Sequence, residues 1–147
     1  MYFPKDVNTS AMTNCEEMFR ESAIEDLDIS VPAVTNMLNM CWMNAQGGNN
    51  LRSVNLRDVG NTITTMESAF RGCYDLASFT TSKPLGEIST LTNVGHLFYA
   101  CHLLKSLDIS LPAGATASIT NADNIVRECV GMETFTFIQP KCKNVSG

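Results

Sequence analysis

The sequence predicts an α/β solenoid, a chain in which one unit of helix and strand is repeated and stacked. Two observations lead to this fold class. Five segments of the chain align with one another in fixed columns, and each is followed by a short alternation of apolar and polar residues. One unit cannot fold alone, because ordering about 28 residues costs roughly 30–50 kcal/mol of conformational entropy, more than its few inward side chains recover. Stacked copies bury each other's flanks.

Each copy begins with a threonine, and the five threonines are 22, 29, 28 and 28 residues apart. They are Thr13, Thr35, Thr64, Thr92 and Thr120. Apolar residues follow two, five, six and usually nine positions later. In the fourth copy they are Val94, Leu97, Phe98 and Cys101, the spacing of one buried face of a helix. We therefore expect a short amphipathic helix at the start of each copy, with the threonine as its N-cap and, in three copies, an acidic residue completing a capping box.

The segment after each expected helix is predicted to be a strand with one buried face. In the fourth copy, Leu104 precedes an alternation in which Leu107 and Ile109 are separated by polar residues, and such alternation is typical of a strand. Strands joined by one crossover pair in parallel. We expect about five rungs, with a parallel sheet on one face and short helices on the other, in a single domain over residues 1–147 that ends in a tail at 139–147.

Composition excludes several classes of function. With 44% hydrophobic residues, 17% charged residues and a net charge of −5, the chain falls among folded proteins rather than disordered ones. No run of Lys and Arg is present to neutralise phosphates, so we expect no binding to nucleic acid. No apolar stretch approaches the roughly 18–20 residues that a membrane span needs, so we expect no membrane insertion.

The columns resemble those of the BspA-like leucine-rich repeat family of bacterial surface proteins. The resemblance is carried by VTNM at 34–37, MESAFRGC at 66–73, HLFYAC at 96–101 and LKSLDIS at 104–110, and it covers about residues 12–138. It implies a right-handed leucine-rich-repeat horseshoe that has no catalytic activity, cofactor or metal. Such a module recognises proteins or glycans at a bacterial cell surface, usually within a longer secreted chain. A component of a phage virion is the alternative.

The cysteines allow two interpretations. Cys73, Cys101 and Cys129 fall in one column, which suggests either a metal or redox ladder or a set of small buried hydrophobic side chains. No Cys-x-x-Cys pair or Cys/His metal spacing occurs, which favours the second. Cysteines on neighbouring rungs are nevertheless close enough for a disulfide. Cys101 is followed by His102 and Asp108, but a catalytic set needs its side chains to converge, and these occupy columns that face in different directions. We therefore expect no enzyme.

A column of cations and aromatic rings occurs seven residues after each threonine. It consists of Arg20, Trp42, Arg71, Tyr99 and Arg127. Two interpretations are open: a surface ladder that stabilises the solenoid through cation–π contacts, or a ridge that binds a partner, because Trp, Tyr and Arg are enriched at binding hot spots.

The outward positions of the strands form a second candidate surface. They are small and polar, and they include Asp28, Asn55 and Asp108. This face either binds a glycan or a polar protein, or it is a solvated sheet. The terminal copies lack evident polar caps, so we expect neighbouring repeats, another domain or other subunits to cover the ends. The protein is expected to be extracellular or on a cell surface if it belongs to a longer secreted chain, and otherwise in a virion.

Overall fold

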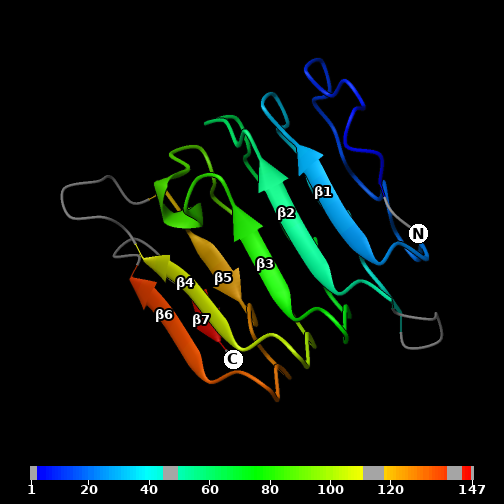
Figure 1. Cartoon of the computed structure of the whole chain (residues 1–147). Coiled ribbons are helices and arrows are strands. Elements are labelled where there is room, and N and C mark those ends of the chain that lie inside the picture. Colours follow the sequence, from blue (N-terminus) through cyan, green and yellow to red (C-terminus); the bar gives the residue numbers. More distant parts are fainter. Residues whose placement is uncertain (1–2, 45–49, 111–117, 139–143, 147) are drawn as a thin grey trace.

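The computed structural model is a parallel β-solenoid of about four turns. It describes residues 3–44, 50–110, 118–138 and 144–146. The elements are β1 (Asp26–Ser30), β2 (Ser53–Arg57), β3 (Ser78–Thr81), the 3-10 helix η1 (Leu85–Glu87), β4 (Ser106–Ser110), β5 (Asn121–Asp123), β6 (Thr134–Ile138) and β7 (Asn144–Ser146). Figure 1 shows β1, β2, β3, β4 and β6 following one another along one wall of the solenoid. Four turns connect these five strands, so the expectation of about five rungs was one too many.

The strand prediction is confirmed in each copy. β1 pairs in parallel with β2, and β2 with β3, so that Leu27, Val54 and Phe79 lie side by side. β4 pairs in parallel with β6, which places Leu107 beside Phe135. These apolar residues point into the solenoid because alternate side chains of a strand leave opposite faces.

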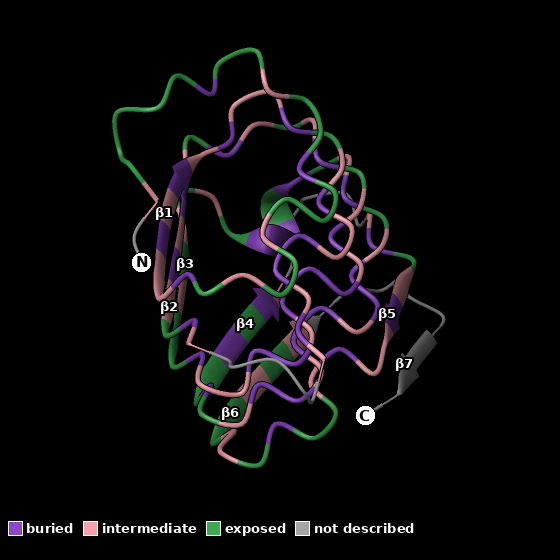
Figure 2. Ribbon diagram, turned by 90° about the vertical axis from the view of Figure 1, so that its right-hand side faces the viewer, coloured by how far each residue is buried: buried purple, intermediate pink, exposed green. Residues whose placement is uncertain are grey.

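The expected single sheet is divided into two. Among the described residues no bridge joins β3 to β4, and Figure 2 shows β4 and β6 inclined to β1, β2 and β3. The connection after β3 explains the break: η1 contacts β4, and its neighbour Ile88 and its own Leu85 are buried. The ring of Phe79, on β3, packs edge-on against Phe98 with centroids 4.8 Å apart. At this point the third and fourth turns are held together by side-chain packing and by the backbone hydrogen bonds of the opposite wall, such as that from Phe70 N–H to Leu97 O.

The prediction of helices on the opposite wall was wrong, and the α/β class with it. The described residues contain no α-helix. The chain after each threonine instead forms a coil. Its backbone N–H groups donate alternately to a carbonyl three residues earlier and to a carbonyl of the next turn of the solenoid. Arg71 N–H donates to Ser68 O at 3.2 Å, whereas Phe70 N–H donates to Leu97 O, 27 residues on, at 3.0 Å. Burial repeats as the sequence predicts, and Val94, with the three apolar residues that share its face, is fully buried.

Positive φ angles explain why these segments are not helical. The residue four positions after every threonine, and the residue eight positions after four of the five, have φ between 52° and 74°. They are Glu17, Asn39, Ser68, His96 and Asn124, and Glu21, Gly72, Ala100 and Glu128. A left-handed residue cannot continue a right-handed helix. Helix axes also need about 8–10 Å between them, whereas strands stack about 4.8 Å apart. A coil that hydrogen-bonds to the next turn gives both walls of the solenoid the same spacing between turns.

The threonine does not serve as an N-cap. The Oγ1 of Thr92 donates to Thr64 O in the preceding turn at 3.1 Å, and equivalent bonds link the other turns. The residue after it takes the capping role, because Asn93 Oδ1 accepts from Gly95 N–H at 3.0 Å. Asn93 also donates to Glu67 at 2.8 Å, so the carboxylate of the expected capping box joins two turns.

This opposite wall is built on parallel backbone pairs between turns. Isolated bridges join Asn14 to Asn36, Asn36 to Thr65, Thr65 to Asn93 and Asn93 to Asn121. β5 and β7 extend the same line, with Asn121 opposite Asn144. Part of the segment expected as a tail therefore forms another strand of this wall. Figure 2 shows β5, which belongs to the same wall, across the solenoid from β1, β2 and β3.

The cysteine column is buried, as the structural interpretation predicts. Cys73 and Cys101 are inaccessible to solvent and Cys129 is 8% exposed. Each thiol donates to a carbonyl of the preceding turn, as Cys101 Sγ does to Phe70 O at 3.2 Å. The five cysteines of the described residues are free thiols, and Cys142 lies outside that part of the chain.

The N-terminal segment lies against the first turn. The ring of Phe3 meets the ring of Phe19 edge-on, with centroids 5.3 Å apart, and Lys5 Nζ lies 3.0 Å from Asp28 Oδ2. Part of the apolar edge of this turn is therefore covered by the chain itself. Within the described residues, no helix has the length and apolar character to cross a membrane.

Candidate functional site

The five residues of the cation and aromatic column lie on consecutive turns and form a line that we call the aromatic ridge. It contains two cation–π pairs. The guanidinium of Arg20 lies 4.1 Å from the centroid of Trp42, and that of Arg71 lies 4.9 Å from the centroid of Tyr99. Arg127, at the end of the ridge, donates to Asn124 Oδ1 at 3.4 Å. Both aromatic rings are only partly buried.

A second line of rings runs beside the ridge, three residues further along each turn. Tyr74 stacks on His102 with centroids 4.7 Å apart, and Val130, which occupies the same column, is 82% exposed. Sequence reasoning missed this line, although the signal was present: Tyr74 and His102 share a column ten residues after their threonines.

The side cleft lies between the ridge and this second line. It is lined by Trp42, Arg71 and Tyr99 on one side and by Tyr74 on the other, with Glu128 on the turn that follows the turn of Tyr99. Its volume is about 250 Å³. The column between the two lines carries Gly72 and Ala100, which also line the cleft. Neither residue has a side chain beyond Cβ that could fill the cleft.

Tyr99 connects the two charges of the cleft. Its ring lies under Arg71, and its hydroxyl donates to Glu128 Oε1 at 2.6 Å. This hydrogen bond raises the pKa of Tyr99 above its ordinary value. Within the described part of the chain, no carboxylate bonds to the guanidinium of Arg71. Arg20, by contrast, is paired with Glu17 at 2.6 Å, so among the described residues Arg71, like Arg127, is a ridge cation without a carboxylate partner.

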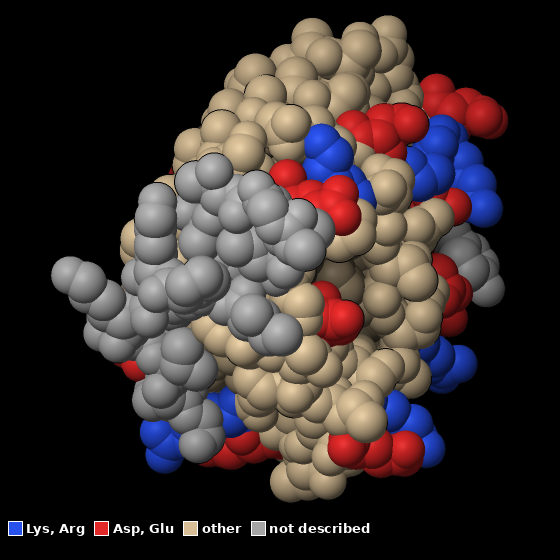
Figure 3. Space-filling view, turned by 90° about the vertical axis from the view of Figure 1, so that its left-hand side faces the viewer, with Lys and Arg blue, Asp and Glu red and all other residues tan. Residues whose placement is uncertain are grey.

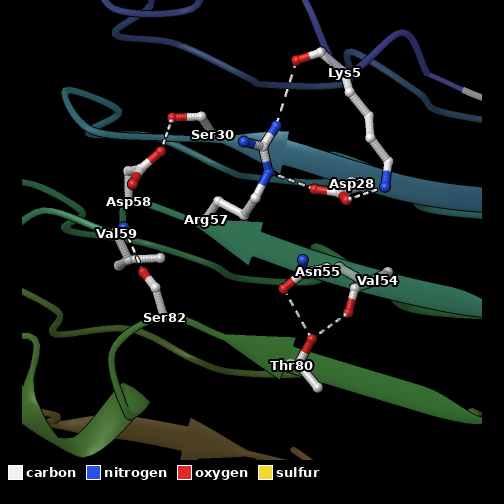
Figure 4. A network of polar contacts seen from close by, with 10 residues as sticks. All are labelled: Lys5, Asp28, Ser30, Val54, Asn55, Arg57, Asp58, Val59, Thr80 and Ser82. Carbon is white, nitrogen blue, oxygen red and sulfur yellow. Dashed lines mark hydrogen bonds and ion pairs between the residues drawn. The ribbon is translucent and has the colours of Figure 1, made fainter.

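The outward face of β1, β2 and β3 is a polar network (Figure 4). Asp28 Oδ1 accepts from Arg57 Nε at 2.5 Å and its other oxygen pairs with Lys5. The hydrogen bond from Lys5, ahead of that from Arg57, lowers the pKa of Asp28. Asn55 Oδ1 accepts from Thr80 Oγ1 at 3.0 Å. These side chains are largely satisfied by one another.

Asp108, the third candidate residue of the outward face, lies in a different sheet from Asp28 and Asn55. Asp28 and Asn55 are direct partners in the register of β1 and β2, whereas Asp108 lies opposite Thr136 in the other sheet. Asp108 is exposed and accepts from Ser110 N–H at 2.8 Å, and its hydrogen bonds with Ser110 lower its pKa. The division between β3 and β4 therefore interrupts the column that the sequence predicts.

A hollow of about 380 Å³ lies between the N-terminal segment and the outer face of β1 and β2. It is lined by Phe3, Lys5, Asp28 and Asn55, among others. Although this hollow is larger than the side cleft, its Lys5 and Asp28 are already paired with each other. It offers fewer free donors and acceptors to a ligand.

The cysteine, histidine and aspartate of LFYACHLLKSLDIS do not converge. Cys101 is fully buried, and burial raises its pKa well above the ordinary value. His102 stacks on Tyr74 at the surface, and Asp108 lies on the outer face of β4. A nucleophile and its base need contact at about 2.6–3.2 Å, and neither His102 nor Asp108 is a hydrogen-bond partner of the Cys101 thiol.

On the side of the molecule seen in Figure 3, acidic and basic side chains are interspersed and the upper part is largely uncharged. This side therefore has no extended field of one sign. The fold and the cleft together define a parallel β-solenoid with an aromatic surface. Comparisons with family models, with curated proteins and with solved structures returned no match.

Proposed function

We propose that the chain is a non-catalytic recognition module that binds a protein or a glycan through the aromatic ridge and the side cleft. The observation that carries this proposal is the meeting of three aromatic rings, those of Trp42, Tyr74 and Tyr99, beside the available guanidinium of Arg71. Partly exposed Trp, Tyr and Arg in one concave patch are the residues that dominate measured binding energies. A ridge that served only to stabilise the solenoid needs no such cleft.

The proposed setting is a bacterial cell surface, with this chain as part of a longer secreted protein. Its support is the sequence resemblance to BspA-like leucine-rich repeats, together with the solenoid, which presents one surface motif on successive turns. In this setting neighbouring repeats or another domain cover the ends of the array.

The experiment is a binding screen of the purified chain against arrays of glycans and of host surface proteins. The wild type is compared with Trp42→Ala and with Arg52→Met, which removes an exposed arginine that lies outside both the ridge and the cleft. We expect at least one ligand that Trp42→Ala binds at least tenfold more weakly, because removing a central aromatic anchor costs about 2 kcal/mol or more. Arg52→Met should bind as the wild type does. Ligands that bind all three proteins equally would contradict the proposal.

A structural component of a phage virion is the second candidate. It is favoured by β6, whose only partner strand among the described residues is β4, and by the half-buried rings of Phe135 and Phe137 on that strand. An unpaired strand edge is a template for another chain. This function predicts concentration-dependent oligomers in light scattering that Phe135→Lys abolishes, and a monomer at all concentrations would exclude it.

A further inference from the structure

We propose that the side cleft binds one neutral pyranose ring, which packs on the aromatic rings of Trp42 and Tyr74 and bonds through its hydroxyls to Arg71 and Glu128. This inference rests on the proposed recognition function and specifies its ligand.

The size of the cleft favours a single small ring. Its volume of about 250 Å³ is below the roughly 300–1,000 Å³ of pockets for drug-sized ligands. Gly72 lines the cleft without a side chain: its φ is +74°, and a Cβ built on it would lie 2.2 Å from the carbonyl oxygen of Met43, so this glycine permits the close approach of the protein's own backbone. A volume of this size is too small for a folded protein segment.

The cleft matches both the apolar faces and the hydroxyl groups of a sugar. A pyranose has apolar C–H faces that pack on aromatic rings, and hydroxyls that both donate and accept. Arg71 supplies only donors, and Glu128 supplies only acceptors, of which Tyr99 uses one. A cation and a carboxylate on either side of one tyrosine can therefore bond to neighbouring hydroxyls of one ring.

The charge balance of the cleft favours a neutral ligand. Among the described residues that line it, the charged side chains are Arg71 and Glu128, one of each sign. An acidic sugar would meet the carboxylate, and the formal charge of −5 on the whole chain also opposes it. An amino sugar would meet the guanidinium. A neutral ring uses both groups as hydrogen-bond partners without an unpaired charge, which would be costly to bury.

The test uses the full chain and its single tryptophan, because a sugar that packs on Trp42 changes the fluorescence of that ring. Methyl glucoside, galactoside and mannoside are each titrated up to about 100 mM, since a ligand of this size binds an open cleft with a Kd of the order of 1–10 mM. Methyl glucuronide and methyl glucosaminide are the charged counterparts. The variants are Tyr74→Ala and Arg71→Met, with Arg52→Met as the matched arginine control, and circular dichroism confirms that each is folded.

We expect saturable binding of at least one neutral glycoside, weakened about tenfold or more by Tyr74→Ala and by Arg71→Met, because each removes a direct contact. Arg52→Met should bind as the wild type does. The proposal is overturned if no neutral glycoside saturates the signal, if Arg71→Met binds as the wild type does, or if a charged glycoside binds more tightly than its neutral counterpart. If no neutral glycoside binds but a ligand from the array screen loses binding with Trp42→Ala, the sugar site alone is overturned and the recognition function stands.

Discussion

Alkaline pH should unfold this protein steeply, because its buried thiols cannot ionise inside the core. Cys41, Cys73 and Cys101 are fully buried, and burial raises the pKa of each above its ordinary value. In the unfolded chain the same thiols ionise near their ordinary pKa of about 8.5. Above that pH the unfolded state has released protons that the folded state still holds, so stability falls as the pH rises.

The magnitude follows from the number of thiols. Each group that stays protonated only in the folded state lowers the free energy of unfolding by about 1.4 kcal/mol per pH unit. Three such thiols give about 4 kcal/mol per unit, against a total stability of roughly 5–15 kcal/mol for a typical domain. Burial raises the pKa of Cys15 to about 11, so this residue adds its share up to that pH. The effect is absent below about pH 8 and ends only at the folded-state pKa values.

The assay is urea unfolding between about pH 7 and 10.5 under reducing conditions, followed by far-ultraviolet circular dichroism. The test variant is Cys101→Ser, whose hydroxyl can donate to the same Phe70 carbonyl but does not titrate in this range. Its stability should fall less steeply than that of the wild type, by about 1.4 kcal/mol per pH unit. Val94→Ala, which removes buried side-chain volume in the same turn, should lower stability at every pH and leave the slope unchanged. Lysine and tyrosine titrations are common to all three proteins.

The reasoning would be refuted by a Cys101→Ser variant with the slope of the wild type. That result would mean that the Cys101 thiol ionises as readily in the folded protein as in the unfolded chain. Rapid labelling of this cysteine by iodoacetamide without denaturant would lead to the same conclusion, because only an accessible thiolate reacts quickly.

Three further predictions concern the backbone, an ion pair and the first turn. Gly72→Ala should destabilise the fold by about 2 kcal/mol or more, because residue 72 has a left-handed conformation and the new Cβ would meet a carbonyl oxygen. Glu21→Gly, at the equivalent exposed position of the first copy, should stabilise the fold by about 0.5–1 kcal/mol. Urea unfolding that gave the opposite sign for either variant would contradict the role of the left-handed conformation. The lowered pKa of Asp28 means that its contribution is present above about pH 4 and lost below it, so Asp28→Asn should remove about 0.2–1 kcal/mol at pH 7 and nothing near pH 2; an equal loss at both would exclude the ion pair as the cause. Phe3→Ala should cost about 1–2 kcal/mol and increase proteolysis before Phe19; unchanged stability and cleavage would show that the N-terminal segment does not protect the first turn.

The sequence alone determines which side chains face the interior. Val94, Leu97 and Phe98 were predicted to share a buried face and are all buried, as are Leu107 and Ile109 of the strand. Burial depends on how side-chain directions repeat along the chain, and that period is visible in one sequence. The strand positions and their parallel pairing follow from the same information.

Contacts between turns decide the rest. The period of a helix and that of the observed coil place the same side chains inside, so the pattern cannot reveal where the N–H groups bond. The coil prevails because a neighbouring turn supplies the carbonyls, as Leu97 does for Phe70, and because helices are too wide for the pitch of the strands. The break between β3 and β4 likewise depends on how η1 packs.

The candidate site was likewise only partly predictable from the sequence. The sequence alone determined the aromatic ridge, because Trp42, Arg71 and Tyr99 recur at one position of the repeat. Only the tertiary structure decided that Tyr74 faces them across a cleft and that Arg71 has no carboxylate partner among the described residues. A column predicts neighbours along the solenoid, whereas a cleft depends on the distance between two columns, which the curvature of each turn sets.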